Sequence, residues 1–212
     1  MIGLGVHIMM LRVTTEQIEA ALLALQQGGV IVYPSETSYG LGCDARNKEA
    51  VKRIFELKGR DDNKALPIII PDFDSASLYI KISPVVEKLA ALFWPGPLNI
   101  IAPTADNSPV AERCASARTQ SVRLSSHPFV ATLVKRFGYP IVATSANIAG
   151  QDAIYEVEKI KDLFWGNDDK PDVFIDGGDL AILPVSTTVK VVDDEHVAIV
   201  RQGKIIIPPE FL

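Results

Sequence analysis

VIVYPSETSYGLGCDA, residues 30–45, is the stretch that decides the fold class. Its first four residues are β-branched or aromatic and predict a short strand, which a proline ends. A loop is predicted for 35–44, which is rich in small hydroxyl side chains and contains Gly40 and Gly42. Ligands of open α/β sheets bind where strands end, and glycines let backbone amides approach a ligand closely. An ordinary strand-to-helix loop explains the same residues equally well.

Helix and strand patterns alternate on both sides of this stretch. Thr14 and Gln17 form a capping box before one helical run, and Asn47 can cap the next, which Gly59 ends. The alternation favours parallel strands, and a closing hairpin adds antiparallel ones. We expect an α/β fold with a mixed sheet, in a single domain that spans 1–212 with its core at about 14–203. Helices are predicted at 14–27, 47–57, 84–94, 128–137 and 156–164, and strands at 66–70, 98–102, 121–124, 140–143, 173–176, 187–192 and 196–201.

The composition is typical of a folded protein without a strongly basic surface. Of the 212 residues, 48% are hydrophobic and 22% are charged, which supports a packed core and argues against disorder. The formal net charge is −5, so non-specific binding to a polyanion is not expected. Cys43 and Cys114 lack metal-ligand spacing, and we expect reduced thiols, buried or free, as in a cytosolic protein.

The N-terminal stretch MIGLGVHIMMLRV is apolar, but it has neither a basic leader nor a cleavage site of small residues. We interpret it as an extra start or an edge strand, not as a signal peptide. No apolar run reaches the ~20 residues that a membrane helix needs. We therefore expect a soluble, cytoplasmic protein without membrane contact.

Three basic residues, Lys58, Arg60 and Lys64, follow the second predicted helix in LKGRDDNKALP, residues 57–67. Cations at this position can simply stabilise the negative end of the helix dipole. They can also form a clamp for phosphates, in which Arg supplies a two-pronged fork and Lys a point charge. Both interpretations stay open on these residues alone.

Two further segments place polar groups at strand ends. Arg123 lies between apolar neighbours in TQSVRLSSHP, where burial would be costly without a partner, so it either points outward or faces a polar pocket. ATSAN, residues 143–147, offers hydroxyl and amide groups that suit either a ligand or a turn. Ser186 and Arg201 occupy comparable positions near the closing hairpin.

The remaining candidates have weaker chemical signals. WPGP, residues 94–97, predicts a rigid structural turn, or else a pocket wall. His7, His127 and His196 show no ligand spacing, and we expect each to be exposed or hydrogen-bonded. No metal cage, serine triad or activated cysteine is predicted.

Taken in order, these segments resemble the YrdC-like family from about Gln17 to Gly203. YPSETSYGLGCDA is similar to the family's Y-P-T-D/E-T-x-Y-G-L-G segment, and KGR matches its K-x-R motif. WPGPLNIIAP resembles W-P-G-P-L-T, and SVRLSSHP resembles V-R-x-P-x-H-P. TSAN matches S-x-N, and the late Ser-Thr and Arg-x-Gly pairs match too. One motif would be a weak signal, whereas the ordered set is specific.

The resemblance implies a twisted α/β domain with a cationic cavity that forms threonylcarbamoyl-AMP and pyrophosphate from L-threonine, bicarbonate and ATP. It implies Mg²⁺ with the ATP, and a product that a separate transferase uses to make N6-threonylcarbamoyladenosine in tRNA, with weak or no direct tRNA binding. No protein nucleophile is required, because positioning and charge neutralisation suffice. Carried over by motif, the threonine site is Thr37, Arg123, Ala143 and Ser186, and the ATP site is Lys58, Arg60, Lys64, Thr119, Ser145, Asn147 and Arg201, with Lys58 and Arg60 catalytic.

Four residues depart from the family pattern and affect substrate geometry more than reaction class. They are Ser35, Asp61 and Asn99, together with Ile69, where some members have a histidine that contacts substrate. The chain ends soon after Arg201, as in the short form of the family. One alternative is a YciO-like protein of the same fold that binds RNA or another nucleotide without this activity. A carbamoyl-transfer domain like that of hydrogenase-maturation proteins is a third, disfavoured by the absence of zinc-finger cysteines.

Overall fold

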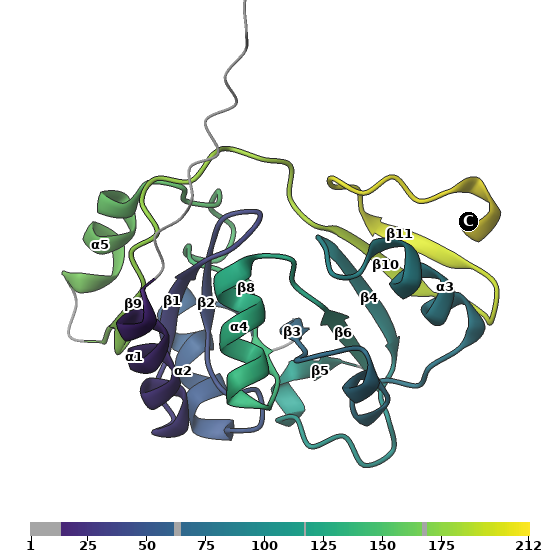
Figure 1. Cartoon of the computed structure of the whole chain (residues 1–212), viewed down its shortest axis with the longest axis horizontal. Coiled ribbons are helices and arrows are strands. Elements are labelled where there is room, and N and C mark those ends of the chain that lie inside the picture. The colour runs from purple at the N-terminus through teal and green to yellow at the C-terminus, as the bar shows by residue number, and fades with distance from the viewer. Residues whose placement is uncertain (1–13, 62–64, 117, 167–168) are drawn as a thin grey trace, which may run out of the picture.

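The computed structural model describes residues 14–61, 65–116, 118–166 and 169–212 (Figure 1). The sequence predictions for the first thirteen residues, His7 included, and for Lys64 lie outside these ranges. The helices within them are α1 (Thr15–Gln26), α2 (Lys48–Lys58), α3 (Pro84–Phe93), α4 (Pro128–Phe137) and α5 (Val157–Trp165), with short 3₁₀ turns at Asp74–Leu78, Glu112–Cys114 and Pro209–Phe211.

Side-chain caps set the ends of the first two helices, as the sequence predicts. At the start of α1, the Gln17 amide donates to Thr14 Oγ1 and the Thr14 amide donates to Gln17 Oε1, which completes the capping box. Asn47 Oδ1 accepts from the first backbone amides of α2. Gly59 ends α2 with a φ of 55°, a left-handed conformation that favours glycine. This conformation of Gly59 fixes the direction in which the chain continues to Arg60 after the helix ends.

The strands fall into two mixed sheets, whereas the sequence predicted one. The mixed α/β class is confirmed, and both sheets combine parallel with antiparallel pairs. The smaller sheet has the order β8 (Thr144–Ser145), β2 (Tyr39–Gly42), β1 (Ile31–Pro34), β9 (Val173–Phe174). The larger has the order β11 (Val197–Arg201), β10 (Thr187–Val191), β4 (Leu98–Pro103), β6 (Thr119–Arg123), β3 (Ile68–Ile69), β7 (Ile141–Val142), with β5 (Ala115–Ser116) on β6.

Strand β2 lies where the sequence predicted a loop. It pairs antiparallel with β1, with Tyr33 opposite Gly40. A side-chain carbon on Gly40 would come within 2.7 Å of the Tyr33 ring, and one on Gly42 within 2.6 Å of the Val142 carbonyl. Close packing against a buried tyrosine therefore accounts for both glycines, which the sequence analysis had connected with ligand approach.

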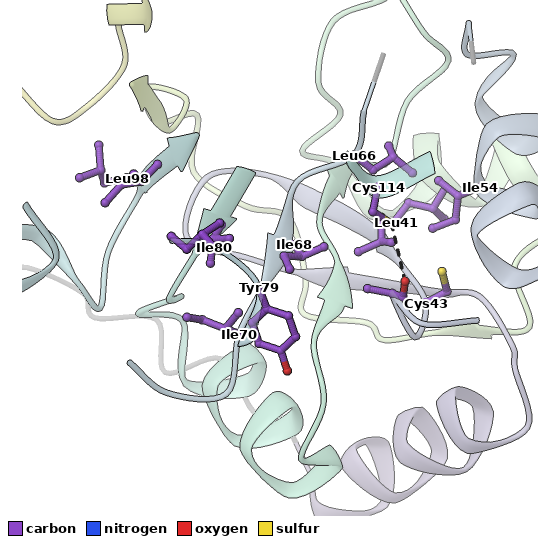
Figure 2. Packing of buried hydrophobic residues seen from close by; sticks show 14 of the residues in the cluster. Leu41, Cys43, Ile54, Leu66, Ile68, Ile70, Tyr79, Ile80, Leu98 and Cys114 are labelled. Atoms are coloured by element: carbon purple, nitrogen blue, oxygen red, sulfur yellow. Dashed lines mark hydrogen bonds between the residues drawn. The ribbon is translucent and has the colours of Figure 1, made fainter. Parts of the chain in front are cut away.

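The buried apolar side chains form two clusters. Figure 2 shows part of the larger one, where Leu41 of β2, Ile54 of α2 and Leu66 pack beside the two cysteines. A second cluster lies beneath α1 and α4, which run side by side in Figure 1 and cover Ile31 and Ile141.

Both cysteines are free and buried, which confirms that prediction. The Cys114 thiol donates to the Ala45 carbonyl at 3.7 Å (dashed in Figure 2). Burial raises the pKa of Cys114 to about 12 and raises that of Cys43 well above its ordinary value. Both side chains therefore act as apolar core groups.

The Trp94–Pro97 segment is structural, as predicted. The Trp94 indole donates to the Leu98 carbonyl at 2.7 Å, and the Gly96 amide donates to the Leu124 carbonyl at 2.8 Å. The turn thereby connects the end of α3 to β4 and to the end of β6. None of the helices in the described ranges has the length and apolar character needed to cross a bilayer.

Candidate active site

A cavity of about 360 Å³ is lined from both sheets. The smaller sheet contributes hydroxyl groups from the end of β1, from β2 and from β8. The larger contributes Arg123 at the end of β6, Ser186 just before β10 and Arg201 at the end of β11, and Arg60 enters from beyond α2. The structure thus brings together eight sequence-predicted site residues: Thr37, Arg60, Arg123, Ala143, Ser145, Asn147, Ser186 and Arg201.

A tight turn between β1 and β2 builds the hydroxyl wall. The Ser35 hydroxyl donates to the Ser38 carbonyl at 2.7 Å, and the Ser35 amide donates to the same oxygen at 3.1 Å. The Thr37 amide donates to Ser35 Oγ, and the two hydroxyls lie 3.3 Å apart. Ser35 therefore closes the turn, as a threonine hydroxyl there could, and Thr37 is held at the cavity surface.

Three guanidinium groups reach the cavity, each anchored by the protein. Arg60 Nη2 donates to the Ala65 carbonyl at 2.9 Å, while Arg201 donates from Nε and Nη2 to the Ser186 carbonyl at 3.1 and 2.9 Å. Burial lowers the pKa of Arg60, and burial followed by the charge of Arg123 lowers the pKa of Arg201. An anionic ligand beside these groups would offset both effects.

Arg123 points inward and is only 6% exposed, which decides the alternative left open by the sequence. Its Nη1 donates to Ser186 Oγ at 2.8 Å and lies 3.7 Å from Glu36 Oε1. Glu36 Oε2 accepts from the Ser125 hydroxyl at 2.9 Å. Although burial opposes ionisation, Arg123 and hydrogen bonds hold the pKa of Glu36 below its ordinary value.

Glu36 is a functional candidate that sequence reasoning missed. It stands directly behind Arg123, with its side chain 13% exposed. The sequence does contain a signal for Glu36. A buried arginine in an apolar strand needs an acidic partner, and Glu36 is an acidic residue that follows the first buried strand.

His127 corrects the prediction that each histidine is exposed or hydrogen-bonded. It is 5% exposed, and neither ring nitrogen has a hydrogen-bond partner among the described residues. Burial lowers its pKa, with Glu36 and Arg123 nearby acting in opposite directions, so the ring is neutral at pH 7. His196 is half-buried, and its Nδ1 lies 3.0 Å from Asp193 Oδ1, so it is hydrogen-bonded, as expected.

Two other predicted residues lie beside the main cavity. Lys58 is buried and borders a side pocket of about 340 Å³, together with Gly59–Asp61 and Ala149–Gly150. Thr119 borders a third pocket of about 330 Å³, and its hydroxyl donates to the Ser116 carbonyl at 2.7 Å. Each pocket shares lining residues with the main cavity: the side pocket shares Arg60, Ser145 and Asn147, and the third shares Pro67, Asn99 and Arg201.

The departures from the family pattern have distinct locations. Asn99 lines the cavity, and its amide donates to Thr188 Oγ1 at 3.4 Å. Ile69 is a core residue of β3, and Asp61 is exposed at the edge of the side pocket. Across the described ranges, no three His, Cys, Asp or Glu side chains gather in a way that could hold a metal ion.

Comparison with known proteins places the chain among one group of relatives. The family model Sua5_yciO_yrdC, described as "Telomere recombination", matches residues 23–203. A threonylcarbamoyl-AMP synthase of Pseudoalteromonas translucida is 37% identical over 150 residues, which cover 69% of this chain and 80% of the relative. One of Bacillus subtilis is 35% identical over 193 residues, which cover 89% of this chain and 54% of the relative.

Solved structures give the same picture. P. abyssi Sua5 complexed with L-threonine has a TM-score of 0.80 at 34% identity, over 88% of this chain and 54% of that one. E. coli YciO has a TM-score of 0.80 at 28% identity, over 94% of both chains. The chain thus spans about half the length of the B. subtilis and P. abyssi relatives.

Proposed function

The chain belongs to the Sua5/YciO/YrdC family, and from this premise we propose that it is a threonylcarbamoyl-AMP synthase. The reaction joins L-threonine, bicarbonate and ATP to give threonylcarbamoyl-AMP, pyrophosphate and water. The observation that carries the proposal is the convergence of Arg60, Arg123 and Arg201 with a wall of small hydroxyls on one cavity. These side chains come from the motifs by which the sequence resembles the family.

Arg123 and Ser186 form the amino-acid end of the proposed site. A guanidinium can hold a carboxylate through two parallel hydrogen bonds, and Arg123 Nη1 is already oriented by the Ser186 hydroxyl. Thr37 and Ala143 line the same cavity and complete the threonine pocket.

Arg60, Arg201, Ser145 and Asn147 form the nucleotide end. The adjoining pocket that holds Thr119 shares Arg201 with the cavity, so an extended ligand such as ATP can span both spaces. Two guanidinium groups recognise the negative charge of phosphates well, because each can donate paired hydrogen bonds to phosphate oxygens.

This arrangement suits adenylate transfer without a covalent protein intermediate. The carbamate formed from threonine and bicarbonate attacks the α-phosphorus of ATP through one oxygen, and the bond to the pyrophosphate oxygen breaks. The arginines are held in place before reaction, so they stabilise the charge that builds up without reorganising. Carbamate formation releases water and a proton, whereas the transfer step itself needs no catalytic base, because the carbamate is already an anion.

The cavity composition also fits magnesium bound with ATP. Mg²⁺ is usually held by one or two carboxylates together with substrate phosphates. Among the described lining residues Asp152 supplies a carboxylate, and hydroxyl groups line the same cavity. Asp152 would hold the ion, which supplies charge neutralisation for the leaving pyrophosphate when bound.

The product would serve threonylcarbamoyl transfer to tRNA by separate machinery. The net charge of −5 supports weak or no direct tRNA binding by this chain. With this function we propose a cytoplasmic location, where ATP, threonine and tRNA are all present.

The test is to incubate the protein with ATP, L-threonine and bicarbonate, then to measure pyrophosphate and detect the adenylate by mass. We expect pyrophosphate release that requires threonine and bicarbonate together. Equal release with either one omitted would identify a nucleotide hydrolase. Tight nucleotide or RNA binding without adenylate formation would identify a YciO-like binding protein.

A further inference from the structure

Lys58 uses its whole hydrogen-bonding capacity on one segment of the protein. An ammonium group has three N–H donors. Those of Lys58 go to the Ser145 carbonyl, to the Asn147 carbonyl at 2.7 Å and to Asn147 Oδ1 at 3.2 Å. The backbone carbonyl of Lys58 also accepts from the Ala149 amide at 2.8 Å. With 2% of the residue exposed, no donor remains for a ligand in this conformation.

The segment that Lys58 holds is a wall of the main cavity. Ser145 and Asn147 line the cavity, as does Gln151. The Asn147 amide nitrogen donates to the Gln151 carbonyl at 2.6 Å, so the contact from Lys58 continues through Asn147 into the next part of the wall. Strand β8 has only two residues, and its pairing with β2 gives this wall little support of its own.

A positive charge suits this role better than an apolar side chain would. Three acceptors converge on one point, and removing the donor would leave them buried without partners, which is costly. Burial, and then the charge of Arg60, lower the pKa of Lys58 to about 8, so the group is mostly an ammonium at pH 7. Arg60, two residues further on, lines the cavity itself.

We infer that Lys58 is a positioning residue, which fixes the 145–151 wall of the cavity through its carbonyl groups and Asn147 and does not contact the ATP phosphates. This replaces the sequence prediction that Lys58 is catalytic and part of the phosphate clamp, and leaves Arg60 as the clamp residue of the K-x-R motif. The effect of Lys58 on turnover rests on the proposed function, whereas the burial and the contacts of Lys58 do not.

The first test uses trace acetylation of the full, unmodified chain at pH 8, read residue by residue by mass spectrometry. Lys52 is the internal control, because it lies on the same helix with 54% of its side chain exposed. We expect Lys58 to be acetylated much more slowly than Lys52, although its lowered pKa favours reaction. The ratio of the two rates should stay the same at saturating ATP, with saturation established by calorimetry.

Two results overturn the inference: acetylation of Lys58 as fast as that of Lys52, or any change in their ratio when ATP binds. If calorimetry detects no ATP binding, the proposed function fails, and the ATP-free comparison still tests the environment of Lys58.

The second test compares Lys58→Arg and Lys58→Met with the matched variant Arg60→Lys. If Lys58 only supplied positive charge to phosphates, Lys58→Arg would keep that function. If Lys58 positions the wall, Lys58→Arg should lose the function, because the planar guanidinium does not fit three converging carbonyls. We expect both Lys58 variants to lose about 10²-fold in kcat per folded molecule, the usual result of a displaced site. Arg60→Lys should keep part of the activity.

Asn147→Ala is measured alone as well, because Asn147 also lines the nucleotide end. The loss of kcat in Lys58→Met/Asn147→Ala should be smaller than the product of the two single losses, because both changes release the same wall. The kcat of each variant is measured well below its melting temperature, so that a loss of kcat is not caused by unfolding. Retained kcat in Lys58→Arg, or additive losses in the double variant, would assign Lys58 to the phosphates. Should the variants fail to fold, the acetylation ratio decides alone.

Discussion

Arg123→Ala removes the buried cation on which the amino-acid end of the site depends. The guanidinium is 6% exposed and oriented by Ser186. Loss of a buried, charged hydrogen-bond partner costs about 2–5 kcal/mol in binding. We therefore expect the Kd for threonine to rise roughly 30-fold or more. The Kd for ATP should change much less, because Arg60 and Arg201 are separately anchored.

The same substitution should destabilise the protein through Glu36. Breaking a buried ion pair from one side costs about 3–5 kcal/mol. We expect about 3 kcal/mol, the lower end of that range, because Ser125 still donates to Glu36 and the charges are 3.7 Å apart. The double variant Arg123→Ala/Glu36→Gln is the matched control. It should regain most of the stability and none of the threonine affinity.

The pH dependence of stability should change sign at Glu36. In the parent the pKa of Glu36 is depressed, so its contribution is lost as pH falls through that pKa. Without Arg123, burial should raise the pKa of Glu36 above the unfolded value, and stability is then lost as pH rises through the new pKa. The deficit of Arg123→Ala should therefore be larger at pH 7 than at about pH 4, near the ordinary glutamate pKa.

Calorimetry with each ligand separately, and urea unfolding at both pH values, measure these effects. Unchanged threonine affinity beside a large loss for ATP would refute the division of the cavity into two ends. A double variant that stays as unstable as Arg123→Ala would refute the role given to Glu36.

Three further changes test other parts of the structure. Arg60→Ala should reduce turnover about 10²–10³-fold, and Arg60→Lys should recover part of it. Near-normal pyrophosphate release from folded Arg60→Ala would mean that Arg60 only stabilises the helix end. Gly203→Ala should destabilise by about 1–3 kcal/mol in urea unfolding, because its new carbon would overlap the Val185 carbonyl, and an unchanged midpoint would contradict that contact. Cys43 and Cys114 should resist a thiol reagent at pH 8 until urea unfolds the chain, and rapid native labelling would be inconsistent with their burial.

Local signals in the sequence predicted the helices well. The capping box at Thr14 and the Asn47 cap with Gly59 are complete within a few residues, so no distant contact is needed to recognise them. The closing hairpin at 187–201 was predictable for the same reason.

Features that depend on distant contacts were not predictable. Strand β2 has two glycines because a side-chain carbon at either position would come too close to the Tyr33 ring, a contact that only the folded structure reveals. The division into two sheets depends on pairings such as β4 with β10, nearly ninety residues apart in sequence.

In the site, too, the residues could be predicted from the sequence, but their side-chain contacts could not. Motif resemblance selected eight residues that do line the cavity. It could not reveal that Lys58 turns toward the carbonyls of 145–147, or that Glu36 pairs with Arg123, because both depend on side-chain direction.

The cavity draws its lining from the first strand, Tyr33 in β1, through to Arg201 in the last, β11. Within the described residues, the lining comes from segments far apart in the sequence and from both sheets. Ligand affinity should therefore appear only in molecules that have completed long-range folding, and binding will shift the equilibrium toward that state alone. In a cell, substrate would therefore stabilise fully folded copies selectively, and at saturating substrate the bound amount would equal the amount of fully folded protein.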